Sequence, residues 1–532
     1  MIYYYYLGVF NGKKNFLYDN LDLSIVLIIY SVLAIFSIIY YHFNLGADGI
    51  SYISIALKYV NGDWANAING VWSPLYSWLM TPILLLFYNP FNASYVTRIV
   101  SLIVGFFTII GINKLAVTFK LQRLMKRYLL ITSIPMILFF AIFYDTPDLL
   151  VACLLIYYFS FIFESSYPTT STSGALCGLI GALAFLSKSY ILPFFIVHFI
   201  FFNILYYFKG CKINKMQVKK NLIIGLAVFF IISGIWIGAL SEKYDKPTIS
   251  TAINYNHAII GPDYLKHQGD SLGLIKPPNP TATSVWEDPS IIKLKDWSPF
   301  ESWENFEFQI KNIINNLYLT LFLIEYYSIL SIAIIIISLY YILKQDTEKY
   351  FKTKLIYLLI TISLYSAGYI LMFIQERFFW PVIILLMIWG FYLISSLYKN
   401  KVLSAKLRNI LIIILMGSFI LTPVYGLITY PQTDGEQLSK TLKNNYGIHG
   451  NIASNDGWSE TNKISYYLNS QYYGLPKNIN NSSQLENELM ANNITYYFVW
   501  GDSSNLTLIS YKEITNGKIH GLKIYSWGGK NI

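Results

Sequence analysis

Eleven long apolar segments constrain the fold of this 532-residue chain more than any other feature. A helix needs about 20 predominantly apolar residues to cross the hydrocarbon core of a bilayer. Only 13% of the residues are charged and the mean hydropathy is +0.45, whereas soluble domains carry about 25% charged residues. We therefore expect a polytopic α-helical membrane protein. The predicted spans are residues 21–43, 95–117, 128–143, 147–163, 174–187, 190–208, 221–240, 317–343, 354–373, 379–397 and 409–428.

One further apolar piece, residues 75–88, is short and lies between prolines, so it could either cross the membrane or lie along its surface. The basic residues favour the second arrangement. With this piece lying flat, 19 of the 39 Lys and Arg residues fall in short loops on one side of the membrane. Such loops are typical of the cytoplasmic side. We therefore predict eleven spans in a plasma membrane, a cytoplasmic N-terminus and an extracytoplasmic C-terminal region.

Charge and cysteine content exclude several other classes of protein. The net charge of +10 is explained by the basic cytoplasmic loops and does not indicate nucleic-acid binding. The three cysteines (Cys153, Cys177 and Cys211) lie in or beside apolar runs without metal-type spacing, so they predict neither a disulfide framework nor a zinc site. The first apolar run is too long for a signal peptide and is expected to remain as an anchor.

The hydropathy changes near residue 430, which divides the chain into two predicted domains. Residues 1–428 are expected to form the transmembrane domain, with outer loops at 44–94 and 241–316, and residues 429–532 a small extracytoplasmic α/β domain. The predicted elements of the second domain are helices at 435–445 and 484–492 and strands at 451–454, 495–500 and 522–526. In the longer outer loop, Trp286, Trp297 and Trp303 favour anchoring at the membrane interface over a sugar-stacking surface.

Ionisable residues recur at the predicted outer ends of the spans. They are Asp48, Asp145, Asp148, Lys188, Glu376 and Arg377. Each has an ordinary explanation: the aspartates could cap helices, the lysine could snorkel to the interface, and the arginine could pair with its neighbouring glutamate. Asp48, for example, could cap the amphipathic segment at 50–60. Because all six are predicted on one face, we favour a functional site there.

Five motifs follow one another along the chain in a characteristic order. They are Asp48 after the first span, Trp-Ser-Pro-Leu-Tyr-Ser-Trp at 72–78, Thr-Pro-Asp-Leu-Leu at 146–150, Gly-Ala-Leu-Ala-Phe-Leu-Ser-Lys at 181–188 and Glu-Arg-Phe-Phe-Trp-Pro at 376–381. This ordered set resembles the GT-C membrane glycosyltransferases of the protein O-mannosyltransferase and lipid A aminoarabinose transferase type, over roughly residues 21–430. Two departures are Gly49, where the family often has Glu after the first acid, and Ser-Pro at 73–74, where Pro-Pro is common.

The resemblance implies a sugar donor carried on a polyprenyl phosphate and an acceptor (lipid, glycan or protein) reached from the extracytoplasmic side. It implies that Asp48 is the base and that a second acid orients a substrate, while Lys188 and Arg377 stabilise the leaving phosphate. The second acid is Asp148 or Asp145, and the Asp-Leu-Leu context favours Asp148. The remaining candidate substrate-binding residues are Glu376, Tyr76, Trp72, Tyr190 and His257.

No cofactor is expected, and Gly49 after Asp48 weakens the case for a divalent metal. Two alternatives stay open: a lipid or polysaccharide transporter, and a lipid-sugar polymerase or ligase. A transporter is expected to show internal repeats and a polar path near the membrane midplane, and the sequence shows neither.

Overall fold

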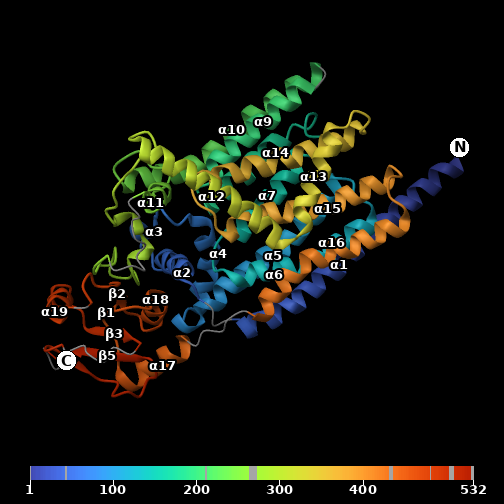
Figure 1. The fold of residues 1–532 in the computed structure, drawn as a ribbon. Coiled ribbons are helices and arrows are strands. Elements are labelled where there is room, and N and C mark those ends of the chain that lie inside the picture. The colour runs from blue at the N-terminus through green and yellow to red at the C-terminus, as the bar shows by residue number, and fades with distance from the viewer. Residues whose placement is uncertain are drawn as a thin grey trace.

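The computed structural model describes residues 2–41, 45–209, 212–262, 272–429, 435–479, 481–501 and 508–528. It consists of a body of helices and, at one end of that body, a small sheet flanked by helices (Figure 1). The helices of the body are α1 (Ile2–Tyr41), α2 (Ala47–Val60), α3 (Trp64–Ala67), α4 (Pro74–Phe87), η1 (Pro90–Asn92), α5 (Ala93–Thr118), α6 (Arg123–Phe143), α7 (Asp148–Ile162), α8 (Ser173–Ser187), α9 (Ile191–Lys209), α10 (Lys212–Lys243), α11 (Ala252–Ile259), η2 (Val285–Glu287), η3 (Pro289–Ile291), α12 (Trp303–Tyr327), α13 (Leu330–Leu343), α14 (Lys349–Leu371), η4 (Glu376–Phe379), α15 (Trp380–Lys399) and α16 (Ala405–Thr429).

The helices confirm a polytopic membrane protein. Within the described part of the chain, eight helices are long and apolar enough to cross a membrane, or nine if the bent pair α12 and α13 forms one span. Each predicted span coincides with an apolar helix or helix pair, although α7 and α8 have only 15 residues each. The most enclosed of the long helices is α15, which lies at the centre of the body and is buried along its apolar stretch.

The predicted span at 317–343 differs from the structure, because it is not one straight helix. Helix α12 ends at Tyr327, α13 begins at Leu330, and the two meet at 107°. Ser328 between them is extended, and its hydroxyl lies 2.7 Å from the Ser418 hydroxyl of α16. The sequence has neither Pro nor Gly at the break, so it carries no local signal for a helix end.

Helices α8 and α10 approach so closely that glycine is required between them. A Cβ atom on Gly178 would lie 2.1 Å from the Gly225 carbonyl oxygen, and one on Gly174 would lie 2.3 Å from the Asn221 carbonyl oxygen. The run of small residues at 174–184 explains this contact, because small side chains allow two helix backbones to approach.

We expect Gly178→Ala to destabilise the protein by about 1–3 kcal/mol, because one methyl group forces two backbones apart. The matched control is Gly234→Ala in α10, where a new Cβ meets nothing within 4 Å. That change should leave stability equal or slightly raised, because alanine favours the helix. The midpoint of thermal unfolding in detergent measures both, and equal midpoints would contradict the close contact.

The C-terminal module (residues 435–528) contains a five-stranded sheet of order β2-β1-β3-β5-β4. Strands β2, β1 and β3 run parallel to one another, while β5 is antiparallel to both β3 and β4. The elements are α17 (Gly435–Tyr446), β1 (Asn451–Ser454), α18 (Trp458–Tyr467), β2 (Gln471–Tyr472), α19 (Ser482–Ala491), β3 (Tyr496–Trp500), β4 (Tyr511–Glu513) and β5 (Leu522–Trp527). The five predicted elements are confirmed. The elements α18, β2 and β4 were not predicted, since the two strands are very short and α18 is largely polar.

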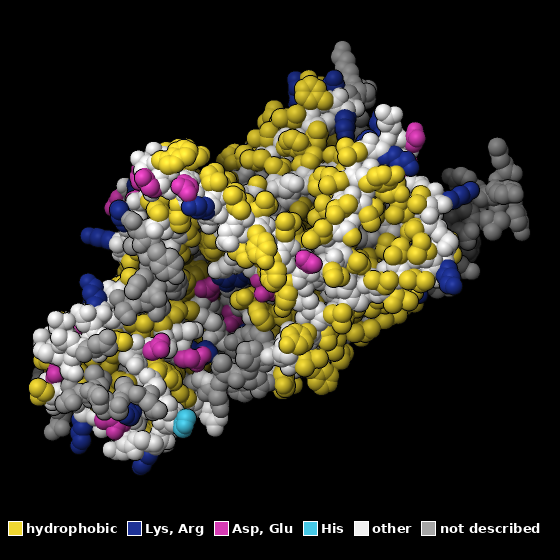
Figure 2. Space-filling model, viewed as in Figure 1, with side chains coloured by type: hydrophobic (Ala, Val, Ile, Leu, Met, Phe, Trp, Pro, Cys, Tyr) yellow, Lys and Arg dark blue, Asp and Glu magenta, His cyan; other side chains and the backbone are white. Residues whose placement is uncertain are grey.

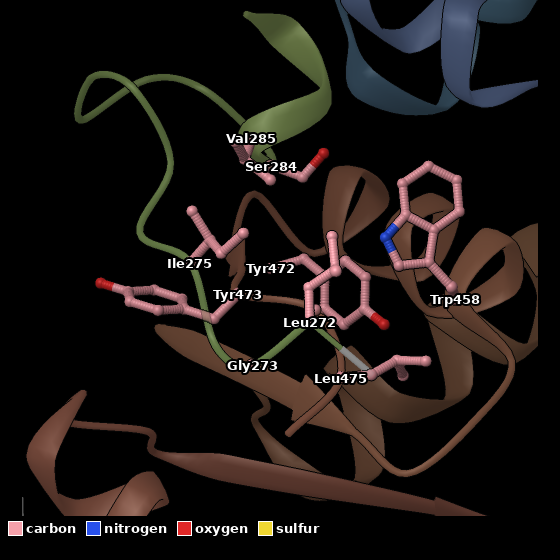
Figure 3. Close-up of a pocket in the computed structure, with 10 residues that line it drawn as sticks. Leu272, Gly273, Ile275, Ser284, Val285, Trp458, Tyr472, Tyr473 and Leu475 are labelled. Carbon is pink, nitrogen blue, oxygen red and sulfur yellow. The ribbon is translucent and has the colours of Figure 1, made fainter. Parts of the chain in front are cut away.

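The loop from residue 272 to 288 joins this module to the helical body. Backbone amides of Gly273 and Ile275 donate to carbonyls of Leu475 and Tyr473 at 3.2 and 2.8 Å. The Tyr472 amide in turn donates to the Thr283 carbonyl at 2.6 Å. Figure 3 shows two parts of this loop, one at residues 272–275 and one at residues 284–285, around Tyr472, Tyr473 and Trp458. The loop is therefore part of the module's hydrogen-bonded structure and places α18 next to α2.

Candidate functional site

A cavity of about 570 Å³ lies between the helical body and the C-terminal module. Figure 2 shows acidic and basic side chains gathered in a hollow between these two parts of the molecule. The walls come from α2, the segment before α4, the start of α7, the α8–α9 connection, α11, η2, η4, the end of α14 and α18. Because so many elements far apart in the chain contribute to it, the cavity is the candidate functional site.

Four charged side chains form a continuous cluster on its wall, which we call the charged quartet: Asp48, Asp148, Lys188 and Arg377. Arg377 Nη1 donates to Asp48 Oδ2 at 2.7 Å, and Arg377 Nε lies 3.7 Å from Asp148 Oδ2. Lys188 Nζ donates to Asp148 Oδ1 at 2.5 Å. The structure thus brings together four of the predicted site residues, and their charges alternate in sign.

Helix ends place all four groups. Asp48 is in the first turn of α2 and Asp148 is the first residue of α7, while Lys188 directly follows α8 and Arg377 lies in η4. The capping explanation is wrong for both aspartates. The N-cap of α2 is Gly46 and that of α7 is Pro147, and neither helix has a side-chain capping hydrogen bond. Each carboxylate instead pairs with a cation.

The quartet is only partly accessible to solvent, so its charges act strongly on one another. The Asp48 and Arg377 side chains are each 17% exposed, whereas Asp148 is 4% exposed. Burial lowers the pKa of Lys188 to about 8, and the neighbouring Asp148 carboxylate opposes part of that effect. The ammonium group also lies 3.6 Å from the centre of the Phe378 ring, a cation–π contact that stabilises its charged form.

Trp286 joins the quartet and was not predicted to do so. Its indole Nε1 donates to Asp48 Oδ1 at 2.8 Å, so Asp48 accepts one hydrogen bond from Arg377 and one from Trp286. The expected role as an interfacial anchor is wrong for Trp286, which lines the cavity. Trp297 is buried against His257, whereas Trp303 is 73% exposed on α12.

Of the other predicted residues, Trp72 and Tyr190 line the cavity. Trp72 Nε1 donates to the Trp286 carbonyl at 3.0 Å, and the Tyr190 hydroxyl donates to the Tyr365 carbonyl at 2.5 Å. Trp458, at the start of α18, lines the same cavity, and no sequence pattern predicted this. Its ring centre lies 5.7 Å from that of Trp286.

Asp145 lies away from the cavity lining and has a different environment. Its carboxylate pairs with Arg98 Nη2 at 3.0 Å and accepts from the Thr97 hydroxyl and the Gly46 amide at 2.9 and 3.1 Å. Burial raises its pKa, and the Arg98 guanidinium opposes that rise. Because Asp145 ties α5 to the start of α2, the structure supports a structural role for it and leaves Asp148 as the second acid of the cavity.

Three further candidates also lie outside the residues that line the cavity. The Tyr327 hydroxyl donates to the Glu376 carboxylate. Tyr76 is buried in the body, with its hydroxyl 2.9 Å from that of Ser101. His257 stacks on the Trp297 ring at 4.7 Å. Each of these contacts supports local packing. Among the described residues, no group of three or more His, Cys, Asp and Glu side chains is arranged to hold a metal ion.

Comparison with known proteins identifies the fold. No protein-family model and no curated protein matches the chain in sequence. The fold of the chain is similar to that of a solved membrane glycosyltransferase. The apo crystal structure of the Archaeoglobus fulgidus oligosaccharyltransferase matches with a TM-score of 0.51 and 13% identity, covering 90% of this chain and 69% of that chain.

Crystal structures of ArnT from Cupriavidus metallidurans, in the apo state and bound to undecaprenyl phosphate, also match. Both give a TM-score of 0.47 and cover 94% of this chain and 97% of that chain, at 10% and 11% identity.

Proposed function

We propose that this chain is a membrane glycosyltransferase that moves a sugar from a polyprenyl-phosphate donor to an acceptor hydroxyl on the extracytoplasmic side. The observation that carries the proposal is the charged quartet at the wall of a cavity with a largely apolar lining. The shared fold with an oligosaccharyltransferase supports the same class of reaction. In this proposal residues 1–428 are the catalytic domain and residues 429–532 an extracytoplasmic domain.

The two cations suit the phosphate of the donor. Arg377 presents a planar fork of donors and Lys188 a compact ammonium group, and both lie at the cavity wall. In the structure they pair with carboxylates, so the quartet is close to neutral. An entering phosphate takes over some of these hydrogen bonds and frees Asp48 from Arg377. Apolar residues extend the cavity and are suited to a prenyl chain: Pro193, Ile253, Ile259, Met372 and Phe373.

Asp48 is the proposed base because its carboxylate faces the cavity beside Arg377. It accepts the proton of the acceptor hydroxyl while the acceptor oxygen forms a bond to the anomeric carbon of the sugar. The bond between that carbon and the donor phosphate oxygen breaks, and its electron pair leaves with the prenyl phosphate. Lys188 and Arg377 stabilise the negative charge on this leaving group. Asp148 holds Lys188 in place and orients the sugar or the acceptor.

The test uses the full chain in proteoliposomes with radiolabelled polyprenyl-phosphate sugars and lipid, glycan and protein acceptors. We expect wild type to release one prenyl phosphate for each sugar transferred, and the labelled fraction to identify the acceptor class. Arg377→Gln should lower donor kcat/KM by about 10- to 100-fold, because the phosphate loses its forked partner. Movement of intact labelled lipid between leaflets without sugar transfer would show a transporter instead.

Lys188 gives a separate pH prediction. Its pKa of about 8 means that it loses its positive charge as the pH rises from 7 to 9. Donor kcat/KM should therefore fall on the alkaline side, since that constant reports on groups of the free enzyme. Lys188→Arg keeps a cation at this position at all these pH values. We expect the alkaline fall to move above pH 9 in this variant; the same fall in both proteins would show that another group titrates.

A further inference from the structure

We propose that Trp286 is a positioning residue for Asp48 and that a buried ion pair beneath it, Glu287 with Lys58, holds it in place. This role rests on the proposed function, because Asp48 is the base only if the chain transfers a sugar. With Trp286 and Glu287, a segment of the long loop becomes part of a site that is otherwise built from helix ends.

The first observation is the geometry at Asp48. Its two carboxylate oxygens have different partners, with Arg377 on Oδ2 at 2.7 Å and the Trp286 indole on Oδ1 at 2.8 Å. If the donor phosphate draws Arg377 away, the indole remains to hold the carboxylate in its orientation. A neutral donor suits this role, since it fixes direction without the strong charge stabilisation that would make a carboxylate a poor base.

The second observation is the dense hydrogen bonding of the Trp286 backbone. Its carbonyl oxygen accepts from the Trp72 indole at 3.0 Å and from the Ser51 hydroxyl at 3.3 Å. The following carbonyl, of Glu287, accepts from the Asn69 side chain at 2.7 Å. The backbone on which the indole is carried therefore has little freedom to move.

The third observation is the ion pair itself. Glu287 Oε2 lies 2.8 Å from Lys58 Nζ, and both side chains are only 3% exposed. The same carboxylate accepts from the Ser54 hydroxyl at 2.5 Å and from the Asn279 side chain at 2.7 Å. A buried pair that is held by further hydrogen bonds has little freedom to move, and loss of one partner leaves an uncompensated charge. The pair joins the outer loop to α2, the helix that carries Asp48.

The test measures Asp48 directly. Carbodiimide coupling of an amine to carboxyl groups labels Asp48, and mass spectrometry of the Asp48 peptide gives the rate of labelling at one fixed pH. Trp286→Phe keeps the ring and removes the N–H donor. Because the indole N–H occupies one oxygen of the carboxylate, we expect its loss to speed the labelling of Asp48 severalfold at that pH. Other charged or titratable groups near Asp48 stay unchanged: Arg377, Asp148, Lys188, Tyr52 and Tyr144.

In the transfer assay, Trp286→Phe should lower kcat by about 10-fold while the donor KM changes less than about twofold, because ground-state binding is kept. Trp303→Phe, at an exposed tryptophan on α12, is the matched control and should change neither quantity. A rise in the donor KM with kcat unchanged would show that Trp286 contributes only to donor binding, and would overturn its positioning role.

Glu287→Gln tests the ion pair. It should speed the labelling of Asp48 as Trp286→Phe does, and the double variant Lys58→Met with Glu287→Gln should restore much of the slower wild-type labelling, because no uncompensated charge remains. If the effects of Lys58→Met and Glu287→Gln on the labelling of Asp48 simply add in the double variant, the ion-pair role is overturned. If wild type transfers no sugar from any donor, the proposed function fails, whereas equal labelling rates of Asp48 in wild type and Trp286→Phe overturn the Trp286 contact whatever the reaction.

Discussion

Asp48→Asn is expected to lower the rate of sugar transfer by about 10²–10⁴-fold while the protein remains folded. Removing a positioned general base has an effect of this size. The amide has nearly the same shape as the carboxylate, but it keeps one acceptor oxygen for the two donors Arg377 and Trp286, and it cannot accept the acceptor proton. The measurement is single-turnover transfer from a radiolabelled polyprenyl-phosphate sugar, with detergent chromatography to check folding.

The donor affinity separates a chemical role of Asp48 from a binding role. Loss of the carboxylate leaves Arg377 with one partner fewer, so we expect the variant to bind the donor phosphate at least as tightly as wild type. Asp63→Asn is the matched control: Asp63 caps the short helix α3, and Asn caps as well as Asp. Transfer by Asp48→Asn at the wild-type rate would remove Asp48 as the base and leave Asp148 to be tested in its place.

Asp145→Ala is expected to destabilise the fold by about 3–5 kcal/mol, because it removes one partner of a buried ion pair. The Arg98 and Asp145 side chains are 1% and 2% exposed, so water cannot replace the lost carboxylate. The Gly46 amide at the start of α2 loses its acceptor at the same time. The midpoint of thermal unfolding in detergent, together with the yield of monodisperse protein, measures the effect.

This prediction also distinguishes the two aspartates between which the sequence left a choice, with the Asp-Leu-Leu context favouring Asp148. The fraction of Asp145→Ala that folds should keep the wild-type donor KM, since Asp145 does not line the cavity. Asp148→Asn should instead raise that KM, because Lys188 loses the partner that holds it. Thr97→Val is the matched control for the first variant and removes a single hydrogen bond to Asp145, worth about 1 kcal/mol. A stable Asp145→Ala protein without activity would reverse the two roles.

Several features of the fold could be predicted from the sequence because they depend on local patterns. Long apolar runs identify helices regardless of what surrounds them, and all the predicted spans coincide with apolar helices. The small residues at 174–184 are another local pattern, since small side chains allow the close contact that α8 and α10 make. The ordered motifs were sufficient to suggest the GT-C fold, although no family model matches the sequence.

The same reasoning could have found Arg98. A lone arginine inside the predicted span at 95–117 is costly in a membrane unless it has a partner, and in the structure that partner is Asp145. Arg98 was not among the candidates because the charged candidates all lay at the ends of predicted spans. With Arg98 included, the sequence would have indicated that one of the two aspartates is structural.

The pairing within the site was beyond the reach of local patterns. Asp48 and Arg377 are 329 residues apart in the chain, and Asp48 and Trp286 are 238 apart. Sequence placed Asp48 and Arg377 on one face of the membrane, but contact between them depends on how the helices pack around the central helix α15. Hydropathy and helix-end signals are properties of a few neighbouring residues, whereas the cavity and the partners of each charge arise from packing between distant segments. For this reason the helices and the candidate charged residues could be predicted from the sequence, whereas the partners of Asp48 could be identified only in the tertiary structure.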